Sequence, residues 1–269
     1  LAFMSPSWMT RCGYEAVTLG NPLGEETRYL RTDLRPALIE AIALNRRHGR
    51  GDVALCEYGS CFHVDGERRM ISWAIQLGDD ATAAFAICRG ELEALLGARG
   101  VGNLRYDGLE AADGLLHPRS AAALIVDDVR LGTLGELHPA LREEHDLNTG
   151  LWLVQLDLHR LLDCTASLAT FEHLSRFPAV LRDLALVVDE TTGAGHLADL
   201  AQTIDASLRV QARVFDVYRG KGLQEGKKSV AVRFSIQSTE GTLSEKEVSR
   251  WLKRYEVSVK ERYNAELRS

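Results

Sequence analysis

The sequence predicts an α+β fold in two domains, and three observations lead to this prediction. A chain of 269 residues is roughly twice the length of a common domain. Its first part combines helical periodicity with strand pairs joined by tight turns, which is typical of an antiparallel sheet with helices. Its last part follows the order strand, helix, strand, strand, helix, strand, which is that of a ferredoxin-like βαββαβ fold. We therefore expect domains at 1–165 and 170–269.

Charge separates the same two parts. Residues 170–269 contain 16 Lys and Arg against 14 Asp and Glu, a net charge of +2, whereas residues 1–169 contain 16 against 24, a net charge of −8. All the lysines lie in the later part: Lys221, Lys227, Lys228, Lys246, Lys253 and Lys260. Their clustering predicts a polyanion partner for that part. The sequence shows neither a membrane-length apolar run nor a charged and apolar leader, so we expect a cytoplasmic protein without a membrane partner.

The elements of the first part are predicted in chain order. A helix is expected over Asp33 to Asn45, with Asp33 as N-cap and Pro36 in the first turn. Strands over Val53 to Val64 and Met70 to Leu77 flank an Asp65-Gly66 turn, which predicts an antiparallel hairpin. Further on, the pattern predicts a helix over Ala83 to Leu96 and strands over Ala122 to Val126, Arg130 to Leu137 and Leu151 to Leu156.

The second part gives a clearer pattern. Strands are expected over Leu181 to Asp189, Val210 to Tyr218, Lys228 to Ser238 and Ala265 to Arg268, with a helix over Ala194 to Asp205. Ser244 and Glu247 form a capping box that starts a second helix, which runs to about Tyr263. One stripe of that helix is expected to face the core: Val248, Leu252, Tyr255 and Val259.

The sequence offers no motif for catalysis or metal binding. Its cysteines are odd in number and dispersed, and the spacing of Cys56 and Cys61 is wider than that of a zinc knuckle. The histidines form no HExxH motif and accompany no nucleophile motif. We therefore expect neither a catalytic residue nor a bound metal or cofactor on this chain.

The glycine-rich loop after Tyr218 needs its own interpretation. A P-loop requires GxxxxGK[ST] before a helix, whereas Gly220 and Gly226 are separated by five residues and a strand follows. A dinucleotide fingerprint would need glycine at Glu225. The loop is therefore predicted to join two strands. Its basic residues can still contact an RNA backbone: Arg219, Lys221, Lys227 and Lys228.

The strand before this loop predicts how RNA would bind. Alternation places Phe215, Val217 and Arg219 on one face, with the apolar pair toward the core, and Asp216 and Tyr218 on the other. A base stacked on Tyr218 would contribute about 1–3 kcal/mol, and Asp216 would accept hydrogen bonds from a guanine edge. The alternative is that Tyr218 only packs beneath the loop.

Several segments carry a resemblance to a known family. The second part contains SRFPAVLRDLALVVD, FDVYRGKGLQEGKKSVAVRF, TLSEKEV and RYNAELR, and the first contains NPLGEETRYLRTDLRPALIEAIALN, DVALCEYGSCF, LGELHPALREEHDL and LVQLDLHRLL. In order and spacing they resemble the C-terminal portion of the bacterial phenylalanyl-tRNA synthetase beta subunit. That resemblance implies a class II synthetase-like antiparallel sheet domain followed by a ferredoxin-fold anticodon-binding domain. The family's subunit is much longer, so the chain is expected to be part of one.

The resemblance also implies a function. The chain would belong to an enzyme, phenylalanine-tRNA ligase, as a scaffold for the alpha subunit in an alpha2beta2 assembly, and would bind the anticodon region of tRNA(Phe). ATP and Mg2+ are then expected in the whole enzyme, on the alpha subunit, while the first domain here is catalytically inactive. The family's RNA-contacting positions correspond to Asp216 and Tyr218. Further backbone contacts are expected at Arg176, Arg182, Lys227, Lys228 and Ser229.

Two further expectations concern the arginines of the first part and the start of the chain. Arg28, Arg31 and Arg35 resemble an ATP clamp, but their spacing favours structural salt bridges. The first twenty residues depart from the family pattern and are expected to be poorly ordered. A different class of function remains open, namely a free-standing, non-catalytic RNA- or protein-binding scaffold, and it would show no preference among tRNAs.

Overall fold

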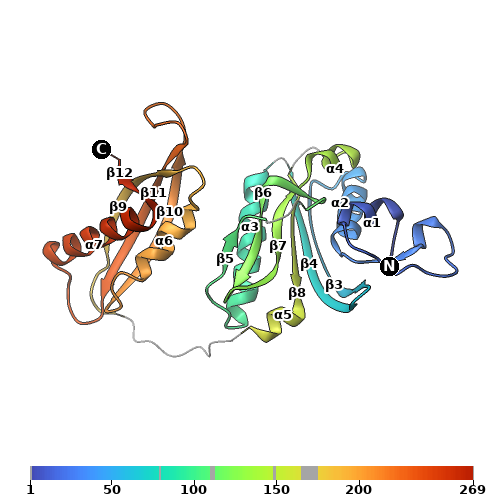
Figure 1. Ribbon diagram of the computed structural model, residues 1–269, viewed down its shortest axis with the longest axis horizontal. Coiled ribbons are helices and arrows are strands. Elements are labelled where there is room, and N and C mark those ends of the chain that lie inside the picture. The colour runs from blue at the N-terminus through green and yellow to red at the C-terminus, as the bar shows by residue number, and fades with distance from the viewer. Residues whose placement is uncertain (1, 79, 110–112, 148–149, 165–174, 269) are drawn as a thin grey trace. The chain divides into compact units, whose positions relative to one another are not determined.

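The computed structural model describes residues 2–78, 80–109, 113–147, 150–164 and 175–268 (Figure 1). The chain divides into two compact units, 1–169 and 170–269. The expected domain boundary, between 165 and 170, lies outside the described residues. Within the described residues, no helix has both the length and the apolar character needed to cross a membrane.

The first unit is built on a six-stranded antiparallel sheet with the order β3-β4-β8-β7-β6-β5. Its elements in chain order are β1 (Phe3–Met4), α1 (Pro6–Cys12), the 3₁₀ turn η1 (Glu25–Thr27), β2 (Tyr29–Leu30), α2 (Arg35–Arg47), β3 (Asp52–His63), β4 (Gly66–Leu77), α3 (Ala81–Ala98), β5 (Arg105–Asp107), β6 (Leu116–Val126), β7 (Val129–Leu137), α4 (Pro139–Glu144), β8 (Trp152–Asp157) and α5 (Leu158–Asp163). This confirms the predicted α+β class with an antiparallel sheet.

Helices cover both faces of this sheet (Figure 1). Side chains alternate along β4, so Ala74 joins the core beneath α2 while Trp73 and Ile75 join the core beneath α3. The β3-β4 hairpin turns at Gly66, whose φ of +139° lies in a region that favours glycine. The predicted hairpin is thereby confirmed, and the sheet is closed on both sides by apolar packing.

The first twenty residues are not the loose segment that was expected. Ser5 caps helix α1 by accepting a hydrogen bond from the backbone N–H of Trp8, and Gly13 ends the helix in the left-handed region. The Trp8 side chain is buried in the core beneath α2, and its indole N–H donates to Glu40 at 2.5 Å. The buried Trp8 ring and its hydrogen bond to Glu40 attach the segment to α2, and these long-range contacts are invisible to a search for local periodicity.

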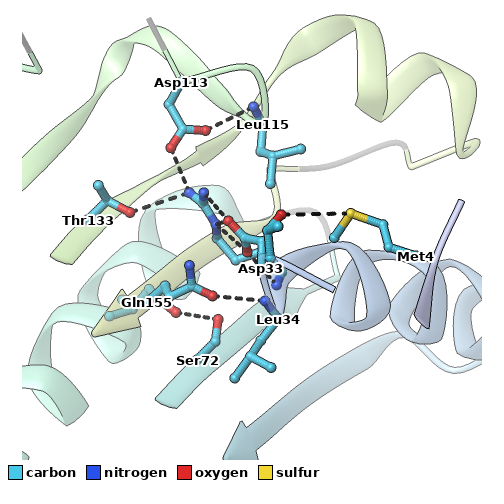
Figure 2. Close-up of polar contacts among 11 residues, drawn as sticks. Met4, Asp33, Leu34, Ser72, Asp113, Leu115, Thr133 and Gln155 are labelled. Carbon is cyan, nitrogen blue, oxygen red and sulfur yellow. Dashed lines mark hydrogen bonds and ion pairs between the residues drawn. The ribbon is translucent and has the colours of Figure 1, made fainter. Parts of the chain in front are cut away.

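A buried ionic cluster, which we call the Arg35 cluster (Asp33, Arg35, Asp113 and Thr133), lies between α2 and the sheet (Figure 2). Arg35 and Asp33 are 3% and 1% exposed, and the guanidinium binds the Asp33 carboxylate through both Nε and Nη2, the latter at 2.6 Å. Its Nη1 binds Asp113 at 2.8 Å and Thr133 at 3.3 Å. Arg35 therefore has its charge neutralised inside the fold.

This cluster corrects the predicted N-cap. Helix α2 starts at Arg35 with Leu34 in the cap position, and Gln155 accepts the hydrogen bond from the Leu34 N–H at 3.0 Å. Asp33, one residue earlier, accepts from the N–H of Arg35 while binding its guanidinium. The carboxylate therefore accepts the first helical N–H and also holds the cluster together, because its ion-pair partner is the first helical residue.

The second unit has the predicted ferredoxin-like architecture. Its elements are β9 (Val180–Asp189), α6 (Ala194–Gln202), β10 (Leu208–Tyr218), β11 (Lys227–Ser238), α7 (Glu245–Tyr263) and β12 (Glu266–Leu267). They form a four-stranded sheet with the order β10-β11-β9-β12. The capping box of Ser244 and Glu247 is present at the start of α7. Both helices share one core with the sheet, joined by the hydrogen bond from the Tyr255 hydroxyl to the Leu197 carbonyl at 2.8 Å.

The buried stripe of α7 differs from the prediction at one position. Val248, Tyr255 and Val259 are buried as expected, but Trp251 is the fourth buried residue and Leu252 is only partly buried. Trp251 stacks on Tyr255 with ring centroids 5.5 Å apart and meets Phe234 edge-on at 5.3 Å. The larger ring fills the space between helix and sheet, and it displaces the aliphatic side chain to the rim of the core.

Candidate functional site

The ferredoxin-like sheet has one face that its helices leave open. On β11, Val230, Val232 and Phe234 are fully buried toward the helices, whereas Arg233 on the opposite face is exposed. Tyr218 of β10 pairs in register with Ser229 of β11, which belongs to the same outward set as Arg233. This open face is the candidate functional site.

Tyr218 lies on the open face and is not sealed beneath the loop. Its side chain is 37% exposed, and its hydroxyl donates to the Lys221 carbonyl at 3.1 Å, which ties the ring to the loop. The Arg268 guanidinium, close to the C-terminal end of the chain, lies 4.8 Å from the ring centroid. Ser229, which pairs with Tyr218 in the sheet, is only 3% exposed. The ring is therefore held in one orientation at the edge of a shallow surface.

A β-bulge in β10 corrects the predicted position of Phe215. Val214 pairs with Val232 and Asp216 pairs with Ala231, so Phe215 is the extra residue in the strand. The bulge leaves Phe215 51% exposed, with the Arg233 guanidinium 5.2 Å from its ring centroid on the open face. Val214 and Val217 take the inward positions instead. The prediction that Phe215 joins Val217 in the core is wrong, because strict alternation fails across the extra residue.

Acidic partners hold most of the basic side chains near Tyr218. Arg219 binds Glu190 at 2.7 Å, Lys227 binds Asp189 at 2.7 Å, and Lys221 is exposed in the loop. Asp216 is exposed beside them. The exposed Arg219–Glu190 pair contributes little stability, on the order of 0–1 kcal/mol, so Arg219 can exchange a carboxylate for a phosphate at small cost.

Three of the expected RNA contacts lie elsewhere in the unit. Lys228 points toward the helix-covered side, is 7% exposed, and donates to the Glu190 carbonyl at 2.7 Å, and burial lowers its pKa. Arg182 binds Glu245 at the start of α7, at 2.5 and 2.7 Å. Arg176 is exposed at the Ser238 end of β11, roughly 30 Å along the strand from Ser229. The structure therefore brings together Asp216, Tyr218, Arg219, Lys221, Lys227 and Ser229.

The open face adds residues that sequence reasoning missed, namely Phe215, Arg233 and Arg268. Period-two alternation along β11 already placed Arg233 on the side of Ser229, so that signal was present. Nothing local marked Arg268, because its contact with Tyr218 depends on β12 pairing with the far side of β9.

Gly220 supports Tyr218, and this leads to a prediction. Its φ is +147°, and an added Cβ would lie 3.1 Å from the Tyr218 hydroxyl oxygen. We expect Gly220→Ala to strain the loop by roughly 1–3 kcal/mol and to displace the ring. Gly241→Ala is the matched control, since its Cβ would meet no atom within 4 Å. Urea unfolding of both variants checks this, and equal stabilities would contradict it.

The first unit shows no catalytic constellation in its described residues. Arg28 binds Glu25, Arg31 binds Glu57, and Arg35 binds Asp33 and Asp113, so these side chains are engaged within the fold as structural salt bridges. Among the described residues, no group of three or more His, Cys, Asp or Glu side chains is placed to hold a metal ion. These contacts agree with the expected structural role, and Arg31 and Arg35 are the more buried of the three.

Comparisons with known proteins agree with this division into units. Residues 1–158 match the family model of the phenylalanyl tRNA synthetase beta chain CLM domain, and residues 175–268 match that of the ferredoxin-fold anticodon binding domain. A solved structure of a pyrrolysyl tRNA synthetase, PylSc from Desulfitobacterium hafniense, is similar with a TM-score of 0.50 and 15% identity, over 60% of this chain and 59% of that one. That likeness concerns the fold alone.

Curated relatives extend the match over nearly the whole chain. The phenylalanine–tRNA ligase beta subunit of Geobacillus kaustophilus is 33% identical over 98% of this chain and 35% of its own length. The beta subunit of Shewanella oneidensis is 31% identical over 95% of this chain and 34% of its own length. The chain thus spans about a third of the length of these relatives. With the family model covering more than half of its residues, the chain belongs to the phenylalanyl-tRNA synthetase beta chain family.

Proposed function

We propose that this chain acts as part of the beta subunit of a phenylalanine–tRNA ligase and binds the anticodon region of tRNA(Phe) through the open face of its second unit. The first unit, taken as residues 1–165, serves as a catalytically inactive scaffold for an alpha subunit in an alpha2beta2 assembly. The second, taken as residues 170–269, contacts the RNA. ATP, Mg2+ and phenylalanine belong to the alpha subunit, and the assembly works in the cytoplasm, where tRNA is charged.

One observation carries the RNA-binding part of this proposal. Tyr218 is accessible on the open face of a ferredoxin-like sheet, within the residues that match an anticodon-binding domain. An unpaired base stacked on this ring would contribute about 1–3 kcal/mol. Asp216, exposed on the same strand, would accept hydrogen bonds from the N–H groups of a guanine.

The first unit supports a subunit partner by a different feature. A groove of about 730 Å³ lies along α2, and its lining combines apolar side chains such as Phe3 and Leu44 with charged ones such as Glu40 and Arg47. Phe3 and Leu44 are 37% and 50% exposed, and Leu23 in the same N-terminal segment is 97% exposed. Exposed apolar side chains surrounded by polar ones are typical of protein interfaces, so we assign this face to the alpha subunit.

A binding experiment tests the proposal. We expect Tyr218→Ala to weaken binding of a tRNA(Phe) anticodon hairpin about five- to hundred-fold at fixed salt, because the stacking surface is removed. Tyr218→Phe keeps the ring and should bind within a few-fold of the parent. Fluorescence anisotropy with the 269-residue chain measures both. A Tyr218→Ala variant that binds as tightly as the parent, or a parent that binds all tRNAs equally, would refute the proposal.

A further inference from the structure

Phe215 is a second exposed aromatic ring on the open face. The bulge that turns it outward lies between two valines that keep their inward positions, Val214 and Val217. Regular alternation would have placed Phe215 in an apolar core, where its burial would stabilise the unit by roughly 1.5–3 kcal/mol. The fold instead exposes half of the ring. Bulges often redirect side chains beside functional sites, so the outward ring is a candidate contact for a ligand.

Arg233 makes this ring part of a built surface. Its guanidinium lies 5.2 Å from the Phe215 ring centroid and is fixed by two hydrogen bonds to Asp183, at 2.8 and 2.7 Å. The same hydrogen bonds lower the pKa of Asp183, so the pair stays charged at neutral pH. A held guanidinium beside a phenyl ring offers a base both a stacking plane and donors, which are the groups that recognise unpaired nucleotides.

The spacing relates this surface to Tyr218. Phe215 and Tyr218 are three residues apart on one strand, so their Cα atoms lie within about 10 Å. Between them lies Asp216, whose register partner is Ala231, itself paired with Ala185. These two small side chains lie on the neighbouring strands, beside Asp216 on the same face. Four-stranded sheets that bind single-stranded RNA commonly stack two or three successive bases on such aromatic positions.

We propose that Phe215 and Arg233 form a second nucleotide subsite, which takes the unpaired base adjacent to the base on Tyr218. This inference rests on the proposed function and deepens it, since it makes the open face a reader of two consecutive nucleotides. Phe215 stacks the base, and Arg233 contacts its edge or the phosphate between the two nucleotides. Asp183 acts as a positioning residue for Arg233.

The test combines protein variants with abasic RNA. The probes are the tRNA(Phe) anticodon hairpin and a set of hairpins that each lack one loop base. With the 269-residue chain, Phe215→Ala should weaken the intact hairpin about five- to hundred-fold. Val257→Ala is the matched control, because Val257 is 56% exposed on α7 and should leave affinity unchanged. One abasic hairpin should be insensitive to Phe215→Ala yet remain sensitive to Tyr218→Ala.

The outcomes separate the inference from the function on which it rests. Support requires that the abasic positions insensitive to Phe215→Ala and to Tyr218→Ala are neighbours in the loop. If Phe215→Ala binds like Val257→Ala while Tyr218→Ala loses affinity, the second subsite is wrong and the proposed function stands. If the two insensitive positions are not neighbours, the subsite is also wrong. If neither variant loses affinity, the proposed function fails as well. Circular dichroism of each variant verifies that the exposed substitutions leave the fold intact.

Discussion

Replacing Arg35 by methionine should destabilise the first unit by about 3–5 kcal/mol, because it leaves buried carboxylates without their cation. Asp33 is 1% exposed, and Arg35 supplies its guanidinium contacts as well as those of Asp113 (Figure 2). Burial by itself would lower the pKa of Arg35, but the charges and hydrogen bonds of Asp33 and Asp113 raise it well above its ordinary value. The Arg35 guanidinium therefore stays charged over the whole physiological pH range.

Peptide-resolved hydrogen exchange in urea measures this loss separately in each unit, which matters because a two-unit chain does not unfold in one step. Protection should fall in α2 and β7 and remain unchanged in α7. Arg28→Met is the control, since its pair with Glu25 is exposed and should contribute little to stability. Removing all the charges together, with Asp33→Asn, Arg35→Met and Asp113→Asn, should recover much of the loss. If the triple variant is no more stable than Arg35→Met, uncompensated charge is not the cause.

Local patterns predicted the regular elements because each pattern has a local physical cause. The Asp65-Gly66 turn set the β3-β4 hairpin, and the capping box at Ser244 set the start of α7. In the same way, alternation along β11 separates Val230 and Phe234 from Arg233. Lys228 and Val230 are two residues apart and therefore share a face, so the same alternation also excludes Lys228 from the open face. The positive charge of Lys228 favours an RNA contact, but its place in the strand turns it toward the helices.

The features that sequence reasoning missed depend on contacts between distant segments. A bulge at Phe215 inserts one residue into the ladder between β10 and β11, and neither strand alone reveals it. Asp33 looks like an ordinary N-cap until the fold brings Asp113 and Thr133 to Arg35. Arg268 reaches Tyr218 only across a completed sheet. The residues of the candidate site could therefore be predicted where alternation along one strand places them. They could not be predicted where contacts between several strands place them.

Trp251→Ala should have a comparably large effect in the second unit. Trp251 is 2% exposed and contacts Phe234 and Tyr255 through ring packing, so its removal leaves a cavity between α7 and the sheet and should cost about 3–5 kcal/mol. For a domain with a total stability of about 5–15 kcal/mol, that loss is a large fraction of the total. Trp251→Phe should cost less. It retains an aromatic ring and removes an indole N–H that has no hydrogen-bond partner among the described residues.

Comparison with Tyr218→Ala separates a loss of stability from a loss of RNA contact, because Trp251 and Tyr218 lie on opposite sides of the same sheet. Trp251→Ala should lower the unfolding midpoint of the second unit and reduce RNA binding only in proportion to the unfolded fraction. Tyr218→Ala should reduce binding at an unchanged midpoint, as the ring is partly exposed. Thermal unfolding and anisotropy on the same samples, with Val257→Ala as the exposed control on α7, distinguish them. If Trp251→Ala lost affinity while fully folded, the helix-covered face would have to contact RNA, and the assignment of binding to the open face would be wrong.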